Sequence, residues 1–177
     1  IIFTIFVIMK NEDLNYILKD ASIDRLMIML IGHPLVGKST FIKENDLEDF
    51  DIISRDELVL DVAGTKDYTE AWKIVDQGKV NIKLKERINF LKGFSDNVII
   101  DMTNMTSKGR KNHLKKFKDF HKVAVVFPFL DKDELEKRQI KRVKEVNKFI
   151  PYEVIDRMKK SFEVPTKDEG FDDIIEL

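Results

Sequence analysis

Two glycines, a lysine and two hydroxyl residues stand together directly after an apolar run. The run RLMIMLI occupies residues 25–31, and GHPLVGKST follows at residues 32–40. Residues 32–39 fit the spacing G-x-x-x-x-G-K-[ST] at every position. In such a loop the backbone N–H groups surround an anion, the lysine reaches phosphate oxygens and the hydroxyl group coordinates Mg²⁺. A tight turn that contains a lysine is the alternative. The buried strand before the loop and the helical pattern after it favour the phosphate loop.

The loop therefore predicts a site for a nucleoside triphosphate with Mg²⁺. We expect Lys38 at the β- and γ-phosphates and Ser39 at the metal ion. His33 has no metal-ligand spacing to the other histidines, and we expect it to contribute its backbone rather than its ring. The residues expected to bind the nucleotide are Gly32, His33, Pro34, Leu35, Val36, Gly37, Lys38, Ser39 and Thr40.

A carboxylate follows the second apolar run, FDIIS at residues 50–54. Asp56 lies at the end of this expected strand, with Arg55 beside it. A carboxylate at this position can take the proton of an attacking hydroxyl group during phosphoryl transfer. The alternative is that Asp56 caps the helix that begins there. The phosphate loop favours the catalytic role, and Arg55 is a candidate for binding the acceptor.

A second carboxylate ends the apolar run NVIID at residues 97–101. Asp101 stands where a carboxylate that holds Mg²⁺, directly or through water, is expected. Thr103 and Asn104 follow it, and they either bind phosphate or shape the loop before the next helix. We therefore expect Asp101 at the metal ion, and Asp101, Thr103 and Asn104 at the substrate.

Two arginines share one face of a later helix. Arg138 and Arg142 are four residues apart in ELEKRQIKRVKEVNKFIP. Arginines that close over a nucleotide can stabilise the charge of the transferred phosphoryl group and exclude water as a lid. The alternative is a solvated helix with Glu–Arg pairs, since Glu134 precedes Arg138 by four residues. With the phosphate loop present, we expect both arginines to bind the nucleotide.

Apolar runs alternate with helical patterns along the chain, which predicts an α/β fold. Continuous apolar runs are typical of strands that are covered on both faces. Strands separated by helices predict a parallel sheet whose ligands bind at the carboxyl ends of the strands. The expected strands are residues 25–31, 50–54, 97–101, 123–129 and 171–177, and the expected helices are residues 38–46, 56–63, 68–92, 107–119, 131–147 and 151–162.

The composition indicates one folded domain, and the net charge of the chain is close to zero. The chain has 177 residues, 43% of them hydrophobic, and a net charge of −1, so nothing global demands nucleic acid. The chain contains no cysteine, which excludes disulfides, thiolate nucleophiles and cysteine zinc sites and fits a cytoplasmic protein. The apolar start IIFTIFVI is too short to span a bilayer and lacks the charge and cleavage site of a signal peptide. We therefore expect no membrane association.

The expected organisation is an N-terminal extension at residues 1–24 and a single domain at residues 25–177. A helical lid is expected at about residues 131–148 of this domain. We interpret residues 1–8 as upstream sequence read in frame or as a fragment edge, and a small extra strand or an apolar flap is the alternative.

Together these motifs resemble the 5′-hydroxyl polynucleotide kinase domain, in particular the phage type, over about residues 25–162. The resemblance rests on GHPLVGKST, SRDE, IIDMTN, KRQIKR and IPYEVIDRMKKSFEVPT. It implies a three-layer P-loop kinase with a central parallel sheet of about five strands. It also implies transfer of the γ-phosphate of ATP to 5′-hydroxyl ends of DNA or RNA, with Mg²⁺ as cofactor. The same resemblance makes Asp56 the general base, Arg142 the lid arginine that meets the phosphates, and Lys38 the third catalytic residue.

One departure from the phage-type pattern concerns the acceptor. That family carries an arginine three residues after the general base, where this chain has Val59. A small-molecule or nucleoside kinase on the same scaffold is therefore an alternative, and an NTP-binding switch or toxin-like protein is another. The basic segment at residues 107–122, with seven Lys and Arg against one Asp, is either a track for a nucleic-acid backbone or a solvated helix. The sequence leaves the oligomeric state open.

Overall fold

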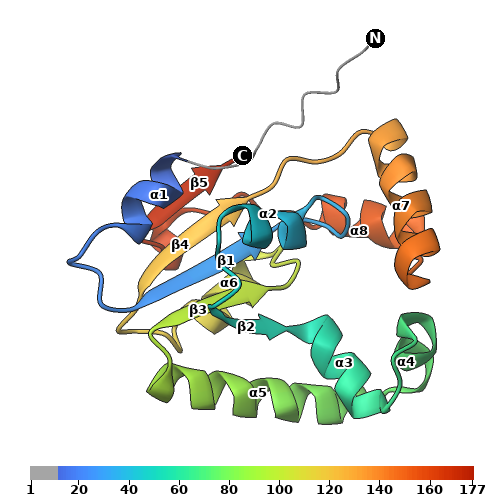
Figure 1. Cartoon of the computed structure of the whole chain (residues 1–177), viewed down its shortest axis with the longest axis horizontal. Coiled ribbons are helices and arrows are strands. Elements are labelled where there is room, and N and C mark those ends of the chain that lie inside the picture. Colours follow the sequence, from blue (N-terminus) through green and yellow to red (C-terminus); the bar gives the residue numbers. More distant parts are fainter. Residues whose placement is uncertain (1–11) are drawn as a thin grey trace.

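Five parallel strands form the centre of the protein, whose computed structural model describes residues 12–177 (Figure 1). The strands are β1 (Leu26–Ile31), β2 (Asp51–Ser54), β3 (Asn97–Asp101), β4 (His121–Val126) and β5 (Asp173–Glu176). Their order across the sheet is β2-β3-β1-β4-β5. Because every neighbouring pair is parallel, all the carboxyl ends lie along one edge of the sheet. The predicted α/β fold with a five-stranded parallel sheet is confirmed.

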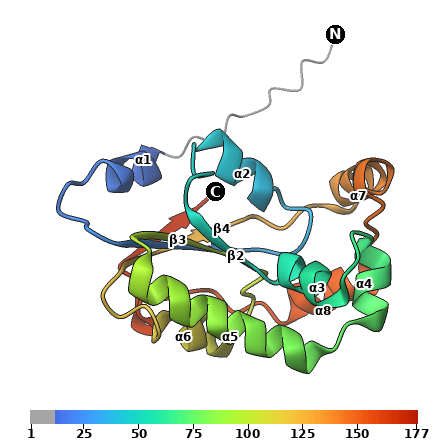
Figure 2. The ribbon, with the colours of Figure 1, turned by 60° about the horizontal axis from the view of Figure 1, so that its bottom comes forward.

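Helices cover both faces of this sheet. They are α1 (Glu12–Leu18), α2 (Lys38–Glu44), α3 (Arg55–Ala63), α4 (Tyr68–Ile74), α5 (Gln77–Phe94), α6 (Ser107–Leu114), α7 (Lys132–Val146), α8 (Tyr152–Lys160) and the short 3₁₀ helix η1 (Lys167–Glu169). Figure 2 shows α1 and α2 on one face and α5 and α6 on the other. Figure 1 shows α3, α4 and α7 beyond the carboxyl ends of the strands.

The central strand β1 is apolar throughout because both of its faces are covered. All six of its residues are buried. Ile28 and Leu30 pack into the core beneath α1 and α2, whereas Met27 and Met29 pack into the core beneath α5 and α6. Successive side chains of a strand point to opposite faces, so a strand between two helical layers needs apolar residues at every position.

One expected helix is two helices. The pattern at residues 68–92 predicts a single helix, but Val75 is extended and separates α4 from α5. The carboxylate of Asp76 accepts hydrogen bonds from the backbone N–H groups of Gly78 and Lys79 and so caps α5. In a continuous helix these N–H groups would donate to carbonyls of the preceding turn. Here the Asp76 side chain accepts their hydrogen bonds instead, which marks the start of a separate helix.

Two neighbouring elements, α6 and β4, also differ in their bounds from the expectation. The helix expected at residues 107–119 ends at Leu114, and the strand expected at residues 123–129 runs from His121 to Val126. Between these elements Phe117 and Phe120 turn into the core and pack edge to face with ring centroids 5.1 Å apart. Two large rings are thus buried within four residues, in the turn between α6 and β4.

The helix α1 lies within the segment that we expected to be an extension. Its Leu14 and Ile17 are buried in the same core as Ile28 and Leu30 of β1. Part of the N-terminal segment therefore belongs to the folded body. The interpretation of residues 1–8 concerns residues outside the described part of the chain.

A buried ion pair fixes the start of α6. Arg110 is completely buried, and its Nε and one terminal nitrogen donate to the two carboxylate oxygens of Glu169 at 2.7 and 2.6 Å. The other terminal nitrogen donates to the backbone carbonyls of Asn104 and Met105 at 3.0 and 3.1 Å. Arg110 thus ties the loop after β3 to η1. It belongs to the basic segment of residues 107–122, but it is a structural residue rather than part of a charged surface.

We expect Glu169→Gln to destabilise the protein by about 3–5 kcal/mol, because removal of one partner leaves a buried charge without compensation. The matched control is Asp61→Asn, which breaks an exposed ion pair with Lys83 and should cost less than about 1 kcal/mol. Urea unfolding at neutral pH measures both changes. Equal effects of the two substitutions would contradict the structural role of the Arg110–Glu169 pair.

The loss of stability in Glu169→Gln should depend on pH. Burial opposes ionisation of Glu169, but the hydrogen bonds and charge of Arg110 outweigh it and lower the pKa of this carboxyl. A group with a lowered pKa stabilises the folded state above its unfolded-state pKa, and this stabilisation is lost as the pH falls. The difference in the free energy of unfolding between the wild type and Glu169→Gln should therefore become smaller as the pH is lowered, as measured by urea unfolding at acidic pH.

Candidate active site

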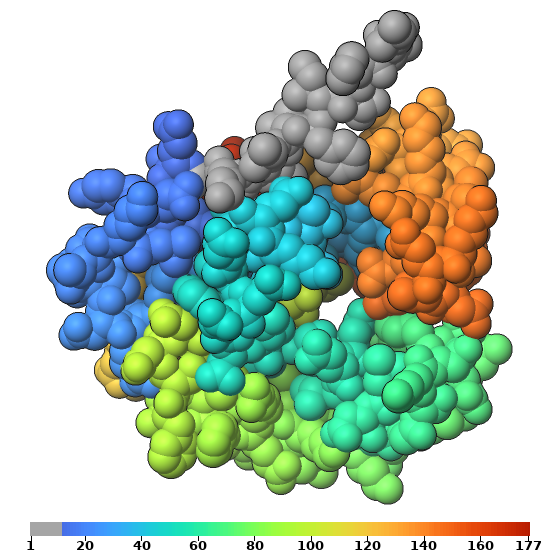
Figure 3. Space-filling view, viewed as in Figure 1, coloured from blue at the N-terminus to red at the C-terminus, as the bar shows by residue number. Residues whose placement is uncertain are grey.

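A cavity of about 1500 Å³ opens at the carboxyl ends of the central strands. It lies between the loop after β1, the starts of α3 and α4, and the helices α7 and α8. In Figure 3 the surface is hollowed between α7 and the α3–α4 region. Sites for small ligands usually measure about 300–1,000 Å³, so this cavity has room for a nucleotide and part of a second substrate.

The two glycines of the phosphate loop are required by its backbone. A Cβ atom at Gly32 would lie 2.9 Å from Cγ2 of Val36 and 3.0 Å from Cβ of Phe127. Gly37 has a φ of 109°, a conformation that side chains disfavour. Leu35 also has a positive φ, of 73°. The loop therefore holds a strained turn, which is typical of backbone that binds a ligand.

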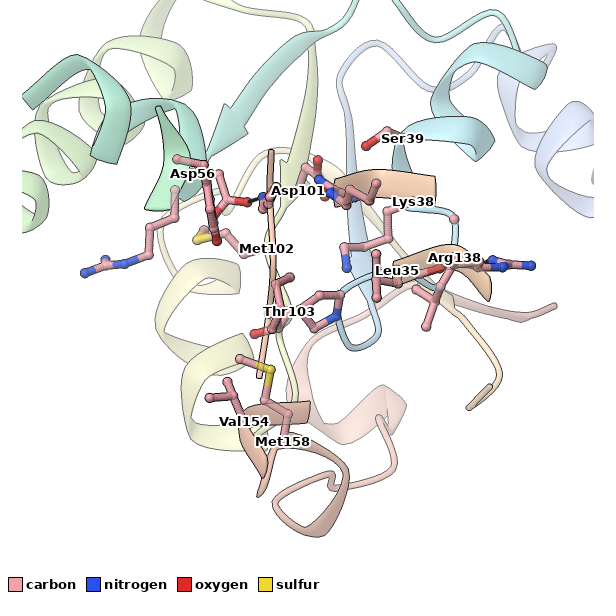
Figure 4. A pocket seen from close by; sticks show the side chains of 18 of the residues that line it. Leu35, Lys38, Ser39, Asp56, Asp101, Met102, Thr103, Arg138, Val154 and Met158 are labelled. Atoms are coloured by element: carbon pink, nitrogen blue, oxygen red, sulfur yellow. Dashed lines mark hydrogen bonds and ion pairs between the residues drawn. The ribbon is translucent and has the colours of Figure 1, made fainter. Parts of the chain in front are cut away.

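The side chain of Lys38 folds back onto the start of the phosphate loop. Its Nζ donates to the carbonyls of Gly32 and His33 at 2.9 and 3.1 Å. Burial lowers the pKa of Lys38 to about 8, while the charges of Asp101 and Asp56 act in the opposite direction. Lys38 is thus a cation inside the cavity, close to both candidate carboxylates (Figure 4).

The imidazole of His33 is a structural group. It is completely buried, with Nδ1 2.6 Å from the carbonyl oxygen of Pro34 and Nε2 3.4 Å from the backbone N–H of Leu130. Burial lowers its pKa to about 4. These partners fix a neutral tautomer in which Nδ1–H donates and Nε2 accepts. The ring ties the phosphate loop to the chain that enters α7.

The two arginines of α7 have different surroundings. Arg138 donates to the carbonyls of Leu35 and Val36 at 3.0 and 3.1 Å and to Glu134 at 2.6 Å. Nε of Arg142, one turn further, is buried and has no hydrogen-bond partner among residues 12–177. Both arginines line the cavity. Arg138 joins the helix to the phosphate loop, whereas the buried Nε of Arg142 stays without a partner in the described part of the chain.

Two carboxylates face Lys38. In the view of Figure 4, Asp101 lies between Asp56 and Lys38. Burial raises the pKa of Asp101, and the charge of Lys38 opposes this rise. Asp56 does not cap α3, because the hydroxyl group of Ser54 accepts the hydrogen bond from the backbone N–H of Glu57. The capping alternative for Asp56 is therefore wrong, and its carboxylate is available for contacts in the cavity.

Asp56 has two partners that the sequence did not indicate. Nζ of Lys148 forms an ion pair with its Oδ2, and the hydroxyl group of Tyr68 donates to its Oδ1 at 3.4 Å. Burial lowers the pKa of Lys148, and the charge of Asp56 opposes this shift. Lys148 is one of many lysines in its segment, and Tyr68 lies in a region expected to be a continuous helix. No spacing rule therefore singles out either residue.

The residues after Asp101 shape the loop. Asn104 has a positive φ of 50°, and its amide donates to the carbonyls of Leu30, Ile100 and Met102. The carbonyl of Thr103 accepts from the backbone N–H of Gly32 at 3.0 Å. Of the two roles considered for Asn104, the structure gives its amide the loop-shaping one. The side chain of Thr103 lines the cavity.

Two positions of α3 that could contact an acceptor, Arg55 and Val59, make contacts with α4 and α5. The guanidinium of Arg55 donates to the side chains of Gln77 and Asn81 in α5 at 2.8 and 3.0 Å. Val59 is completely buried in a cluster with Ala71 and Val80. This position packs α3 against α4 and α5, which explains the apolar residue there.

The basic segment of residues 107–122 contributes little to the cavity. Of the residues in this segment, only Gly109 is among those that line the cavity. Lys115 and Lys116 lie at the opposite end of α6 and belong to a group of positive charges with Lys85 and Lys92 of α5. A nucleic-acid track along this segment would therefore run on the face of α5 and α6.

The donor set at the phosphate loop fits magnesium. Within residues 12–177 no three His, Cys, Asp or Glu side chains form a metal cluster. Mg²⁺ is commonly held by one or two protein oxygens together with water and substrate phosphates, and Ser39 and Asp101 supply oxygens of this kind. None of the described helices has the length and hydrophobicity of a membrane span.

Solved structures share this fold at low sequence identity. One belongs to the Pnkp1/Rnl/Hen1 RNA repair complex, with a TM-score of 0.61 and 20% identity over 81% of this chain and 45% of that chain. A putative kinase from Chloroflexus aurantiacus J-10-fl gives 0.60 and 15% identity over 88% of this chain and 85% of that chain. A gluconokinase from Sinorhizobium meliloti 1021 gives 0.55 and 12% identity over 87% and 82%. This chain thus spans less than half of the RNA repair protein.

A family profile matches most of the chain. The profile of the AAA_33 family, described as an AAA domain, matches residues 27–165, from β1 to the segment after α8. The match includes the phosphate loop, both carboxylates and the arginines of α7. The chain therefore belongs to the AAA_33 family and has a P-loop kinase fold.

Proposed function

We propose that this protein is a kinase that transfers the γ-phosphoryl group of ATP to the 5′-hydroxyl end of DNA or RNA. The observation that carries the proposal is the set of Lys38, Asp56 and Arg142 around one cavity. The first is a loop lysine for the phosphates, and the second is a carboxylate that is not used as a helix cap. The third is an arginine whose buried Nε has no partner among the described residues. Phosphoryl transfer needs these three kinds of group.

Each residue has a distinct role in the proposed reaction. The loop and Lys38 hold the β- and γ-phosphates. Asp56 accepts the proton of the acceptor hydroxyl while its oxygen bonds to the γ-phosphorus and the bond to the β–γ bridging oxygen breaks, so that ADP leaves. Arg142 stabilises the charge of the transferred group. Mg²⁺, when bound by Ser39 and Asp101, neutralises phosphate charge.

Three observations support a polynucleotide acceptor. The cavity of about 1500 Å³ is larger than a nucleotide needs. The motifs around Asp56 and Arg142 resemble those of 5′-hydroxyl polynucleotide kinases. One structural neighbour comes from an RNA repair complex. In this proposal Asp101 and Thr103 lie beside the acceptor, and Arg55 reaches it only after leaving its partners in α5.

A small-molecule kinase is the second candidate. Val59 is buried where the phage-type enzymes carry an arginine that grips the acceptor, and Arg55 is bound to α5. The gluconokinase among the structural neighbours shows that this fold also accompanies small-molecule phosphorylation. The two candidates differ in the acceptor that should receive the γ-phosphoryl group of ATP.

We expect label from γ-labelled ATP on a 5′-hydroxyl oligonucleotide and none on the same oligonucleotide with a 5′-phosphate. The reason is that the phosphate removes the nucleophile without changing the rest of the acceptor. Thin-layer or gel separation measures the products, with free nucleosides and gluconate as parallel acceptors. Label on a small molecule alone would favour the second candidate, and ATP consumption indifferent to every acceptor would indicate an NTP-binding switch.

Asp56→Asn should preserve ATP binding and lower kcat by about 10²–10⁴-fold. The amide has nearly the same shape but cannot take the proton of the hydroxyl group. Since Ser54 caps α3, the helix should keep its start, but the melting temperature should fall because the buried Lys148 loses its carboxylate partner. Calorimetric titration with ATP and the labelling assay separate the two effects. Wild-type turnover in this variant would reject Asp56 as the base.

The arginines of α7 should differ in what they affect. Arg142→Gln should lower kcat by about 10²–10³-fold, as expected for a lost contact to the transition state. Arg138→Gln removes hydrogen bonds to the loop carbonyls of Leu35 and Val36, and it should weaken ATP binding more than it lowers kcat. Turnover at saturating ATP and the dissociation constant for ATP distinguish the variants. An identical pattern for both would contradict the division of roles.

A further inference from the structure

The end of α7 is joined to the start of α4 across the cavity mouth. Asn147 ends α7 in a left-handed conformation with a φ of 49°. Its side-chain amide donates to Oδ2 of Asp67 at 3.0 Å, and its carbonyl accepts from the hydroxyl group of Thr69 at 3.4 Å. Figures 1 and 3 show α7 and α4 facing each other on either side of the opening. These contacts close the ring of chain around the cavity.

The next residue, Lys148, enters the cavity itself. Only 8% of its side chain is exposed, and its Nζ pairs with Oδ2 of Asp56. The same ammonium lies 3.7 Å from the centre of the Tyr68 ring, and Tyr68 in turn donates to Oδ1 of Asp56. A buried ammonium without a partner is costly, so the ion pair holds both side chains in place.

We propose that Asn147 and Lys148 form a latch that couples closure of α7 over the cavity to the positioning of Asp56. The two residues are consecutive in the chain, so α7 cannot leave α4 without drawing the ammonium away from the carboxylate. Lys148 is therefore a positioning residue: it holds the base in place when the lid is closed. This inference rests on the proposed role of Asp56 as the base.

The ion pair leaves Asp56 able to act. An ionised carboxylate has about four sites that accept hydrogen bonds. Lys148 occupies Oδ2, and the contact of Tyr68 to Oδ1 is long, at 3.4 Å. Oδ1 can therefore receive the acceptor hydroxyl while Oδ2 remains bound. This geometry favours a positioning contact over an inhibitory one.

Lys148→Met tests the latch directly, because it keeps the length of the side chain and removes its charge. We expect kcat to fall about tenfold, since small displacements of a reacting group cost up to about 10²-fold, and ATP affinity to change by less than about twofold. Lys148→Arg should restore most of the activity. Lys144→Met is the matched control, because Lys144 is exposed on α7, the helix that precedes Lys148. Wild-type or increased kcat in Lys148→Met would overturn the proposal.

Asn147→Gly tests the coupling between lid and base. Glycine adopts the same positive φ, and the substitution removes only the amide that binds Asp67. We expect a loss of a few-fold in kcat. If the latch acts through Lys148, the double variant Asn147→Gly/Lys148→Met should lose no more activity than Lys148→Met alone. Multiplication of the two losses would overturn the proposal.

Trp72 provides a readout that does not depend on catalysis. It is the single tryptophan of the chain, it lines the cavity, and its ring lies 6.0 Å from that of Tyr68. Acrylamide quenching of its fluorescence should increase in Lys148→Met and Asn147→Gly and stay unchanged in Lys144→Met. Unchanged quenching in all three variants would overturn the latch.

Asp56→Asn separates failure of the latch from failure of the proposed function. If Asp56→Asn is inactive while Lys148→Met has wild-type kcat, the base assignment stands and the latch is wrong. If Asp56→Asn has full activity, the base assignment falls, and the positioning role of Lys148 falls with it.

Discussion

The candidate active site depends on one constraint, which is that three neighbouring strands end at the same level of the sheet. Asp101 of β3 pairs with Leu30 of β1 on one side and with Ser54 of β2 on the other. A parallel ladder of main-chain hydrogen bonds fixes this register, and the buried strand β1 cannot slip without moving its side chains to the wrong face. The chain therefore leaves the sheet at three adjacent points. The phosphate loop, Asp56 and Asp101 meet there because of backbone geometry.

Buried polar groups then fix the loops that leave these points. The amide of Asn104 binds the carbonyl of Leu30, Arg110 binds the carbonyl of Asn104, and Glu169 binds Arg110. His33 ties the phosphate loop to the chain before α7 in the same way. Buried polar groups need partners, so each of these residues accepts only one local arrangement. Residues that touch no substrate thus set the shape of the cavity.

The sequence predicted the parts of the structure that local patterns encode. The continuous apolar run of β1, the glycine spacing of the loop and the alternation of strands and helices gave the fold class. They also predicted a site at the carboxyl ends of the strands, which is where the structure has its cavity of about 1500 Å³. The sequence could not predict the partner of a charge. Lys148 lies 92 positions from Asp56, and Arg110 looks like its basic neighbours until its contact with Glu169, 59 positions away, is known.

The cations of the cavity show what a triphosphate would have to displace. Lys38 is held by two loop carbonyls, Arg138 by two further carbonyls and Glu134, and Lys148 by Asp56. The carbonyl contacts are hydrogen bonds to neutral acceptors, which are weaker than bonds to an anion. A phosphate can therefore draw Lys38 from the carbonyls more readily than it can draw Lys148 from a carboxylate. The same difference in partner leaves Lys38 free to follow a bound phosphate and keeps Lys148 with Asp56.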